Sequence, residues 1–214
     1  AGSASTTTTV LSVTKTITAG NIIVVAWGSY DNTTLSSLTD NLGNTYTVVE
    51  SNTGSSGARA GIAIGRITVG GSLTTITCNH GSTRYRFAAA AEYSGAGTTT
   101  AVGGGLFSAA SVSPGTWCNN KTIPANGAAF GAHYMSTSSR TFAAGSASGS
   151  PSTSPAVALQ TSSGNGGIAL LHAFAGGSAV TGFTGTVSWS ADGAFQWADA
   201  GFTIDGASTA KKNR

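Results

Sequence analysis

The sequence predicts an all-β protein, a jelly-roll-like β-sandwich built from two repeated halves. The first observation is a repeat: residues 61–72 read GIAIGRITVGGS and residues 167–178 read GIALLHAFAGGS, so the same start and end recur 106 residues apart. The second is a series of alternating or wholly apolar runs with no convincing helical period. The third is a composition rich in Gly, Ala, Ser and Thr, which suits turns and the solvated face of a sheet.

Composition indicates a compact chain in spite of its low charge. Charged residues make up 8% of the 214 residues, against about 25% in an ordinary globular domain. The hydrophobic fraction is nevertheless 40% and the formal net charge is only +3, which is not the composition of a disordered coil. A chain of this length suits one large sandwich or two small domains, and it can bury a substantial core.

The charge pattern argues against nucleic-acid binding, and the hydropathy pattern argues against membrane insertion. The pI is about 9.1, but the basic residues cluster only at Arg84 and Arg86 and in the KKNR ending of residues 211–214. No apolar run approaches the roughly 20 residues that span a bilayer. The first residue is Ala1, which either removal of an initiator Met or cleavage of a leader would leave.

The first half begins with a loose arm, residues 1–9, which are small and polar. Residues 10–17 alternate in polarity, as a half-buried strand does. Residues 22–27, IIVVAW, are apolar on both faces and predict a strand in the middle of a sandwich. Residues 35–39 and 45–49 predict a hairpin around the turn DNLGN.

The rest of the first half and its counterpart are assigned in the same way. We expect strands at 61–69, 73–78 and 85–93, the last in spite of its alanine run, because the flanking residues alternate. In the second half, KTIPANG at residues 121–127 corresponds to KTITAG at residues 15–20. The offset between corresponding residues increases from 106 to 110 or 111 after the second GGS. The remaining expected strands are 128–135, 167–174, 186–189 and 195–204.

Two architectures fit a duplicated chain. In the one we favour, the halves, about 10–97 and 112–206, interleave into a single jelly-roll sandwich that spans residues 10–206. In the alternative, each half forms its own immunoglobulin-like sandwich and the two stand in tandem. The connector 94–112 carries Val102, Leu106 and Phe107 and is expected to be structured, whereas residues 207–214 form a basic tail.

No arrangement of residues predicts catalysis. His133 and His172 lie in apolar strands, and no GxSxG or HExxH motif brings a nucleophile or a metal to them. Asp199 lies in an otherwise apolar strand and suits an ion pair or a contact to a turn. We therefore expect neither an enzyme nor a bound cofactor, and a hydrolase built on a His–Asp pair is the least favoured function.

Two sets of polar residues fit either a chemical role, in an isopeptide bond or a metal site, or an ordinary structural role. Glu92 is the type of residue that joins a Lys and an Asn in the isopeptide bonds of some surface adhesins. Asp40, Asn41 and Asn44 offer oxygen ligands for Ca²⁺ on one loop. Ordinary turn chemistry explains the same three residues, so no metal is predicted.

The remaining candidate site residues are two aromatic residues and two cysteines. Trp117, in the irregular segment 114–120, and Tyr30, at a strand end, are the best candidates for exposed rings that contact a glycan or a partner. Cys78 and Cys118 either form one disulfide or remain two buried thiols, and the sequence leaves both open.

The strand and turn motifs carry a resemblance to a family. These motifs are TITAGNIIVVA at residues 16–26, DNLGNTYT at 40–47, VGGS at 69–72 and EYSG at 92–95. In them the chain resembles phage and bacterial surface β-sandwich domains of the virion decoration, fibre or tail-associated type. The resemblance implies a non-enzymatic protein of a virion surface, bound to capsid or tail proteins as an oligomer or in lattice-bound copies. The alternative is a secreted carbohydrate-binding or adhesin module that binds a host-surface glycan through Trp117 and Tyr30.

Overall fold

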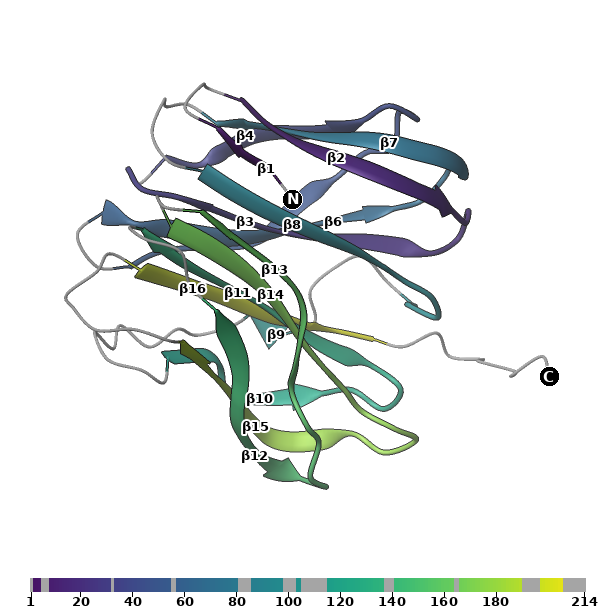
Figure 1. The fold of residues 1–214 in the computed structure, drawn as a ribbon. Helices are drawn as coiled ribbons and strands as arrows, with labels where there is room; N and C mark the ends of the chain where they lie inside the picture. Colours follow the sequence, from purple (N-terminus) through teal and green to yellow (C-terminus); the bar gives the residue numbers. More distant parts are fainter. Residues whose placement is uncertain are drawn as a thin grey trace.

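The protein is a stack of four antiparallel β-sheets, as the computed structural model shows (Figure 1). The structure describes residues 2–4, 8–31, 33–54, 57–80, 86–97, 103–104, 115–136, 141–163, 166–189 and 197–205. The predicted basic tail 207–214 and most of the connector 94–112 lie outside these residues. So does the side chain of Asp199, although its backbone lies in a strand.

The N-terminal half supplies the upper two sheets of Figure 1. Sheet I has the strand order β1-β8-β3-β6-β5, and sheet II the order β2-β7-β4. The strands are β1 (Gly2–Ala4), β2 (Thr8–Ile17), β3 (Ile22–Ser29), β4 (Leu35–Asp40), β5 (Thr47–Thr53), β6 (Arg59–Arg66), β7 (Gly71–His80) and β8 (Arg86–Tyr93). Thus part of the predicted loose arm, residues 1–9, is a short strand against β8.

The C-terminal half supplies the lower two sheets. Sheet III has the order β13-β14-β11-β16-β9, and sheet IV the order β10-β15-β12. The strands are β9 (Gly103–Gly104), β10 (Gly115–Ile123), β11 (Ala128–Ser136), β12 (Phe142–Ser150), β13 (Ala156–Ser163), β14 (Gly166–Phe174), β15 (Val180–Trp189) and β16 (Trp197–Ile204). The strand orders of the two halves correspond one to one, which is what a duplicated chain predicts.

Each half has the strand order of a jelly roll. A long antiparallel hairpin wrapped around a core pairs its first strand with its last and works inward, and here β1 pairs with β8, β2 with β7 and β3 with β6. One bridge, Thr39 to Thr45, continues this series between β4 and the approach to β5. The prediction of an all-β sandwich is therefore confirmed. The described strands pair only within their own halves, so the jelly-roll order occurs once in each half and the halves do not interleave.

Three hydrophobic cores hold the four layers together. The N-terminal core lies between sheets I and II, and the C-terminal core between sheets III and IV. A central core joins the halves through the facing sides of sheets I and III. Its buried residues are Ile22, Val24, Ala26, Ala58, Ala60, Ile62, Ile64, Phe87, Ala89, Ala128, Phe130, Ala132, Tyr134, Ile168 and Leu170.

The central position of β3 follows from its sequence. Because successive side chains of a strand point to opposite faces, an apolar run on both faces must be covered on both sides. Val24 and Ala26 face the central core, while Val25 and Trp27 face the N-terminal core. This arrangement confirms the interpretation of residues 22–27 as a mid-sandwich strand.

Candidate functional site

The DNLGN turn is a clamp made of hydrogen bonds. Asp40 Oδ1 accepts hydrogen bonds from the backbone N–H groups of Leu42 and Asn44, and Oδ2 accepts from the Asn44 amide and the Tyr46 hydroxyl, all at 2.8–3.0 Å. Burial raises the pKa of Asp40, but these hydrogen bonds outweigh burial and leave the pKa below its usual value. Since both carboxylate oxygens are already occupied by donors, the turn needs no Ca²⁺.

Asn44 and Asn41 tie this turn to the next hairpin. Asn44 Oδ1 accepts from the backbone N–H groups of Thr68 and Val69, both at 2.9 Å, and its side chain is only 3% exposed. Asn41 Oδ1 accepts from the N–H groups of Thr74 and Thr75. The motif that carries the family resemblance therefore has a structural role in this chain.

Both strand histidines contact aromatic side chains. His172 Nδ1 lies 3.0 Å from the Tyr93 hydroxyl, and burial lowers the pKa of His172. His133 is fully buried, and its ring stacks on Trp189 with centroids 4.6 Å apart. In the strand ladder His133 lies opposite Asp199. Within the described part of the chain, no group of three His, Cys, Asp or Glu side chains could hold a metal ion.

The expectation that Trp117 is exposed was wrong. Its side chain is fully buried in the C-terminal core, where its indole N–H donates to the carbonyl of Thr186 at 3.2 Å. Trp117 shares the buried face of β10 with Gly115, and the bulge in the pairing with β15, between Thr116 and Cys118, lets Cys118 be buried as well. Tyr30, just beyond β3, is half-buried and is the one sequence-predicted ring that remains partly accessible.

The two cysteines are free thiols. Cys78 belongs to the N-terminal core and Cys118 to the C-terminal core, so two sheets lie between them and the disulfide does not form. Burial raises the pKa of each thiol to about 12, which keeps both protonated and unreactive at neutral pH.

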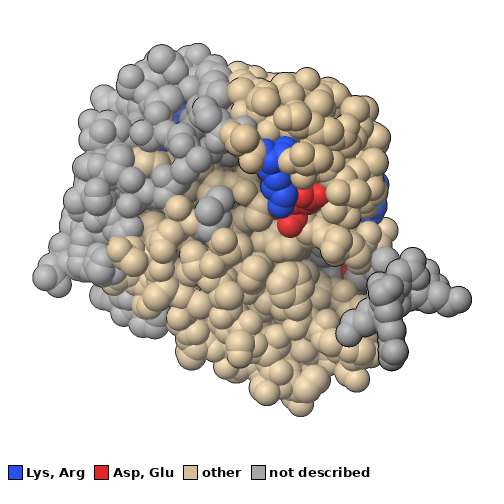
Figure 2. Space-filling model, turned by 45° about the vertical axis from the view of Figure 1, so that its right-hand side comes forward, with Lys and Arg blue, Asp and Glu red and all other residues tan. Residues whose placement is uncertain are grey.

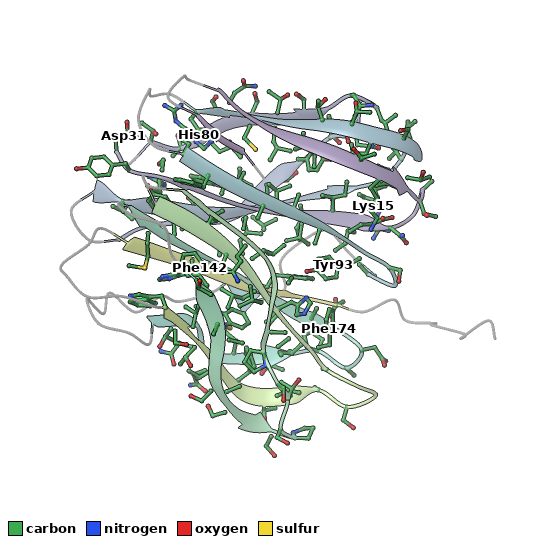
Figure 3. All side chains as sticks on the ribbon, in the orientation of Figure 1. Lys15, Asp31, His80, Tyr93, Phe142 and Phe174 are labelled. Carbon is green, nitrogen blue, oxygen red and sulfur yellow. The ribbon has the colours of Figure 1, made fainter. Side chains whose placement is uncertain are left out.

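An exposed aromatic group that the sequence did not single out lies at one end of the central core. Phe174 is 49% exposed, and its ring is 4.8 Å from that of His172 and 6.0 Å from that of Tyr93 (Figure 3). The Phe174 and Tyr93 rings border a shallow hollow that Asn126 and Asp205 also line. Phe174 follows the alternation of the buried face of β14, so its position at the strand end, beyond the cover of sheet I, is what exposes it.

The one ion pair that the described residues show lies at the same end of β8 as Tyr93, on the other face of the strand. Lys15 Nζ is 3.2 Å from Glu92 Oε2, and Glu92 Oε1 accepts hydrogen bonds from the Asn21 amide and the Thr18 N–H. Lys, Glu and Asn are thus together, as in an isopeptide site. However, the Lys15 side chain is 54% exposed and its ammonium is paired, whereas attack on an amide needs a neutral, desolvated amine.

Polar groups are also buried at the far end of the N-terminal core. Arg86 is fully buried, His80 is 4% exposed, and the His80 ring lies 5.7 Å from that of Trp27. Among the described residues, the Arg86 guanidinium, both His80 nitrogens and the Trp27 N–H have no hydrogen-bond partner. Burial, together with the charge of Arg86, lowers the pKa of His80 to about 4.

This low pKa predicts an acid-sensitive fold. His80 is neutral in the folded protein down to about pH 4, whereas in the unfolded chain it gains a proton near pH 6.5, so stability falls as the pH drops through this window. The loss at pH 4 is about 3 kcal/mol. Denaturant titrations of the wild type and of His80→Phe between pH 7 and 4 measure it. We expect a flatter pH profile for the variant, and parallel profiles would contradict the prediction.

Comparison with known proteins gives no further guide. Scans against protein-family models, curated proteins and solved structures found no match. No helix in the described ranges is long and apolar enough to cross a membrane.

Proposed function

We propose that this chain is a non-enzymatic structural protein of a virion surface, which decorates or extends a phage capsid or tail by binding other virion proteins. The observation that carries the proposal is the stack of two jelly rolls fused through a fully apolar central core. Jelly rolls are frequent in viral capsid proteins, and this part of the argument is an analogy of fold.

The chemistry of the described residues supports a role in packing. The best-connected polar group, around Asp40 and Asn44, ties two turns together, and the buried thiols are inert. The outer sheets II and IV present mainly threonine, serine and alanine side chains to solvent, and few charges appear on the face in Figure 2. A rigid block with such a surface suits docking in many identical copies, on a lattice or as an oligomer.

Purified particles test the proposal. If the protein is a virion component, it sediments with particles in a density gradient in a fixed number of copies per particle, and antibodies against it label the particle surface. A free protein that never accompanies particles would refute it. Particle-free fractions from the same gradient are the control.

The second candidate is a carbohydrate-binding or adhesin module, with its contact surface at Phe174 in place of Trp117. A half-exposed ring beside the polar groups Asn126 and Asp205 is the arrangement that sugar recognition uses, because sugars stack on aromatic faces and hydrogen-bond at their rims.

A glycan array tests this second candidate. If the protein binds a glycan at this surface, Phe174→Ala lowers the affinity about tenfold or more, since a stacking ring contributes on the order of 1–2 kcal/mol. Val69→Ala is the matched control, because Val69 is also about half exposed, at 48%, and lies on a turn of the other half. Equal signals from both variants, or no binding by the wild type, would exclude the module.

A further inference from the structure

The N-terminal half contains a hollow that the described residues leave unfilled. A cavity of about 230 Å³ opens between the edge strand β2 and the part of β8 that β1 does not cover, and its walls are mostly apolar. Its lining residues are Lys15, Ile17, Ile23, Leu73, Ile76, Ala90, Ala91, Glu92 and Ala158. The small side chains of Ala90 and Ala91 on β8 leave this space, whereas β1 covers β8 only at residues 86–88.

The C-terminal half fills the corresponding space. Leu73 pairs with Lys15 in the β2–β7 ladder, and Phe183 pairs with Lys121 in the β10–β15 ladder, so the two apolar residues are equivalent. Phe183 is fully buried, and its ring lies 5.5 Å from that of Trp117. The fold therefore does not require the hollow, and an unfilled apolar cavity is destabilising.

The mouth of the cavity carries one charged pair. Lys15 and Glu92 form the ion pair described above, and Figure 2 shows a basic and an acidic group in contact beside a depression, on a face with few other charges. The Lys15 ammonium keeps donors beyond the one it gives to Glu92. Glu92 Oε2 accepts only from Lys15 among the contacts described, whereas Oε1 already accepts two hydrogen bonds.

We propose that this cavity is a binding site for a small apolar alcohol, whose ring occupies the hollow and whose hydroxyl bridges Lys15 and Glu92. A hydroxyl fits the pair because it accepts from the ammonium and donates to Oε2 at the same time. It also leaves the pair electrically neutral, whereas a carboxylate or an amine would add an unbalanced charge.

The volume of the cavity limits the size of the ligand. An apolar cavity of about 150 Å³ holds benzene. A cavity of about 230 Å³ therefore accommodates a six-membered ring with a short substituent. The proposal depends on the described residues alone and is independent of where the protein acts.

Amide chemical-shift titration of the intact protein tests the site with 2-phenylethanol as the probe. We expect saturable shifts at Ile76, Ala90 and Ala91, with a dissociation constant on the order of 0.1–1 mM, as suits a ligand of this size. Propylbenzene, which has the same length without the hydroxyl, should bind at least about fivefold more weakly, because the charge-assisted hydrogen bonds are lost. Shifts confined to other surfaces, or equal binding of the two probes, would overturn the proposal.

Two lysine variants separate the site from general effects. Lys15→Met keeps the apolar stem and removes the ammonium, so it should weaken 2-phenylethanol at least about fivefold and leave propylbenzene nearly unchanged. Lys121→Met is the matched control, because Lys121 has the equivalent ladder position in the half without the hollow. If the two variants lose the same affinity, Lys15 does not bind the hydroxyl and the proposal fails.

Discussion

Replacing Gly28 by valine should separate the two halves, at a cost of about 3 kcal/mol or more in the free energy of unfolding. A Cβ atom on Gly28 would lie 2.4–2.5 Å from the Cβ and ring atoms of Tyr134 on β11, in the central core. Because the clash is with the root of the Tyr134 side chain, a change of rotamer at its far end does not relieve it. Denaturant unfolding measures the loss.

A double-mutant cycle gives this prediction its control. Tyr134→Gly removes the Cβ as well as the ring, so it should recover much of the stability that Gly28→Val removes, and the two changes should be strongly non-additive. Gly177→Val adds the same side chain where nothing lies within 4 Å and should cost less than about 1 kcal/mol. Additive effects of Gly28→Val and Tyr134→Gly would show that β3 and β11 do not touch in solution.

Asn44→Ala should be the most damaging change in the DNLGN clamp, with an expected loss of about 3–5 kcal/mol. The substitution leaves the N–H groups of Thr68 and Val69 without their acceptor and removes a donor from Asp40. The Asn44 side chain makes five hydrogen bonds, to Asp40, Thr68 and Val69, and each contributes about 0.5–1.5 kcal/mol. Thermal and denaturant unfolding at neutral pH measure the loss.

Asn119→Ala is the comparison for this variant. Asn119 is exposed, and its side-chain oxygen accepts one bond of 3.3 Å from the Thr184 hydroxyl. Its loss should cost less than about 0.5 kcal/mol. If Asn44→Ala is equally mild, then water replaces the clamp and the motif is not what fixes the turn.

Strand positions could be predicted well from the sequence because burial leaves a periodic pattern. The alanine run predicted as a strand lies in β8, where the Phe87–Ala89 face and the Ala88–Ala90 face pack in different cores. By contrast, β12 reads FAAGSASGS, which has no apolar alternation, so its sequence gives no strand signal. Its place in sheet IV comes from pairing with β15.

The repeat predicted the order of the strands better than their register. Gly61 pairs with Trp27, but Gly167 pairs with Met135, which is two residues beyond the position that an offset of 106 predicts. A shift of two residues keeps every side chain on its face, so apolar patterning does not detect it. The predicted hairpin around DNLGN likewise has one bridge, after which β5 crosses to pair with β6.

The candidate sites were harder to predict because they depend on exposure. Trp117 lies among Gly, Pro and Asn residues that suggest a loop, yet in β10 it is buried on the same face as Gly115, with Thr116 between them partly exposed. The cavity depends on Ala90 and Ala91 of β8 facing Lys15 and Ile17 of β2, which are 73 to 76 positions away in the sequence, so the sequence carries no local signal for it. The family resemblance rests on strand and turn motifs, and the structure accounts for the DNLGN turn among them as a hydrogen-bonded clamp.

Amide hydrogen exchange of the intact protein tests most directly whether the two jelly rolls share one core. If they do, the slowest amides lie in β3 and β11, the middle strands of sheets I and III, and they exchange at the same rate because both are released only by global unfolding. Fast exchange throughout one of these two strands, with slow exchange in the other, would contradict a shared core.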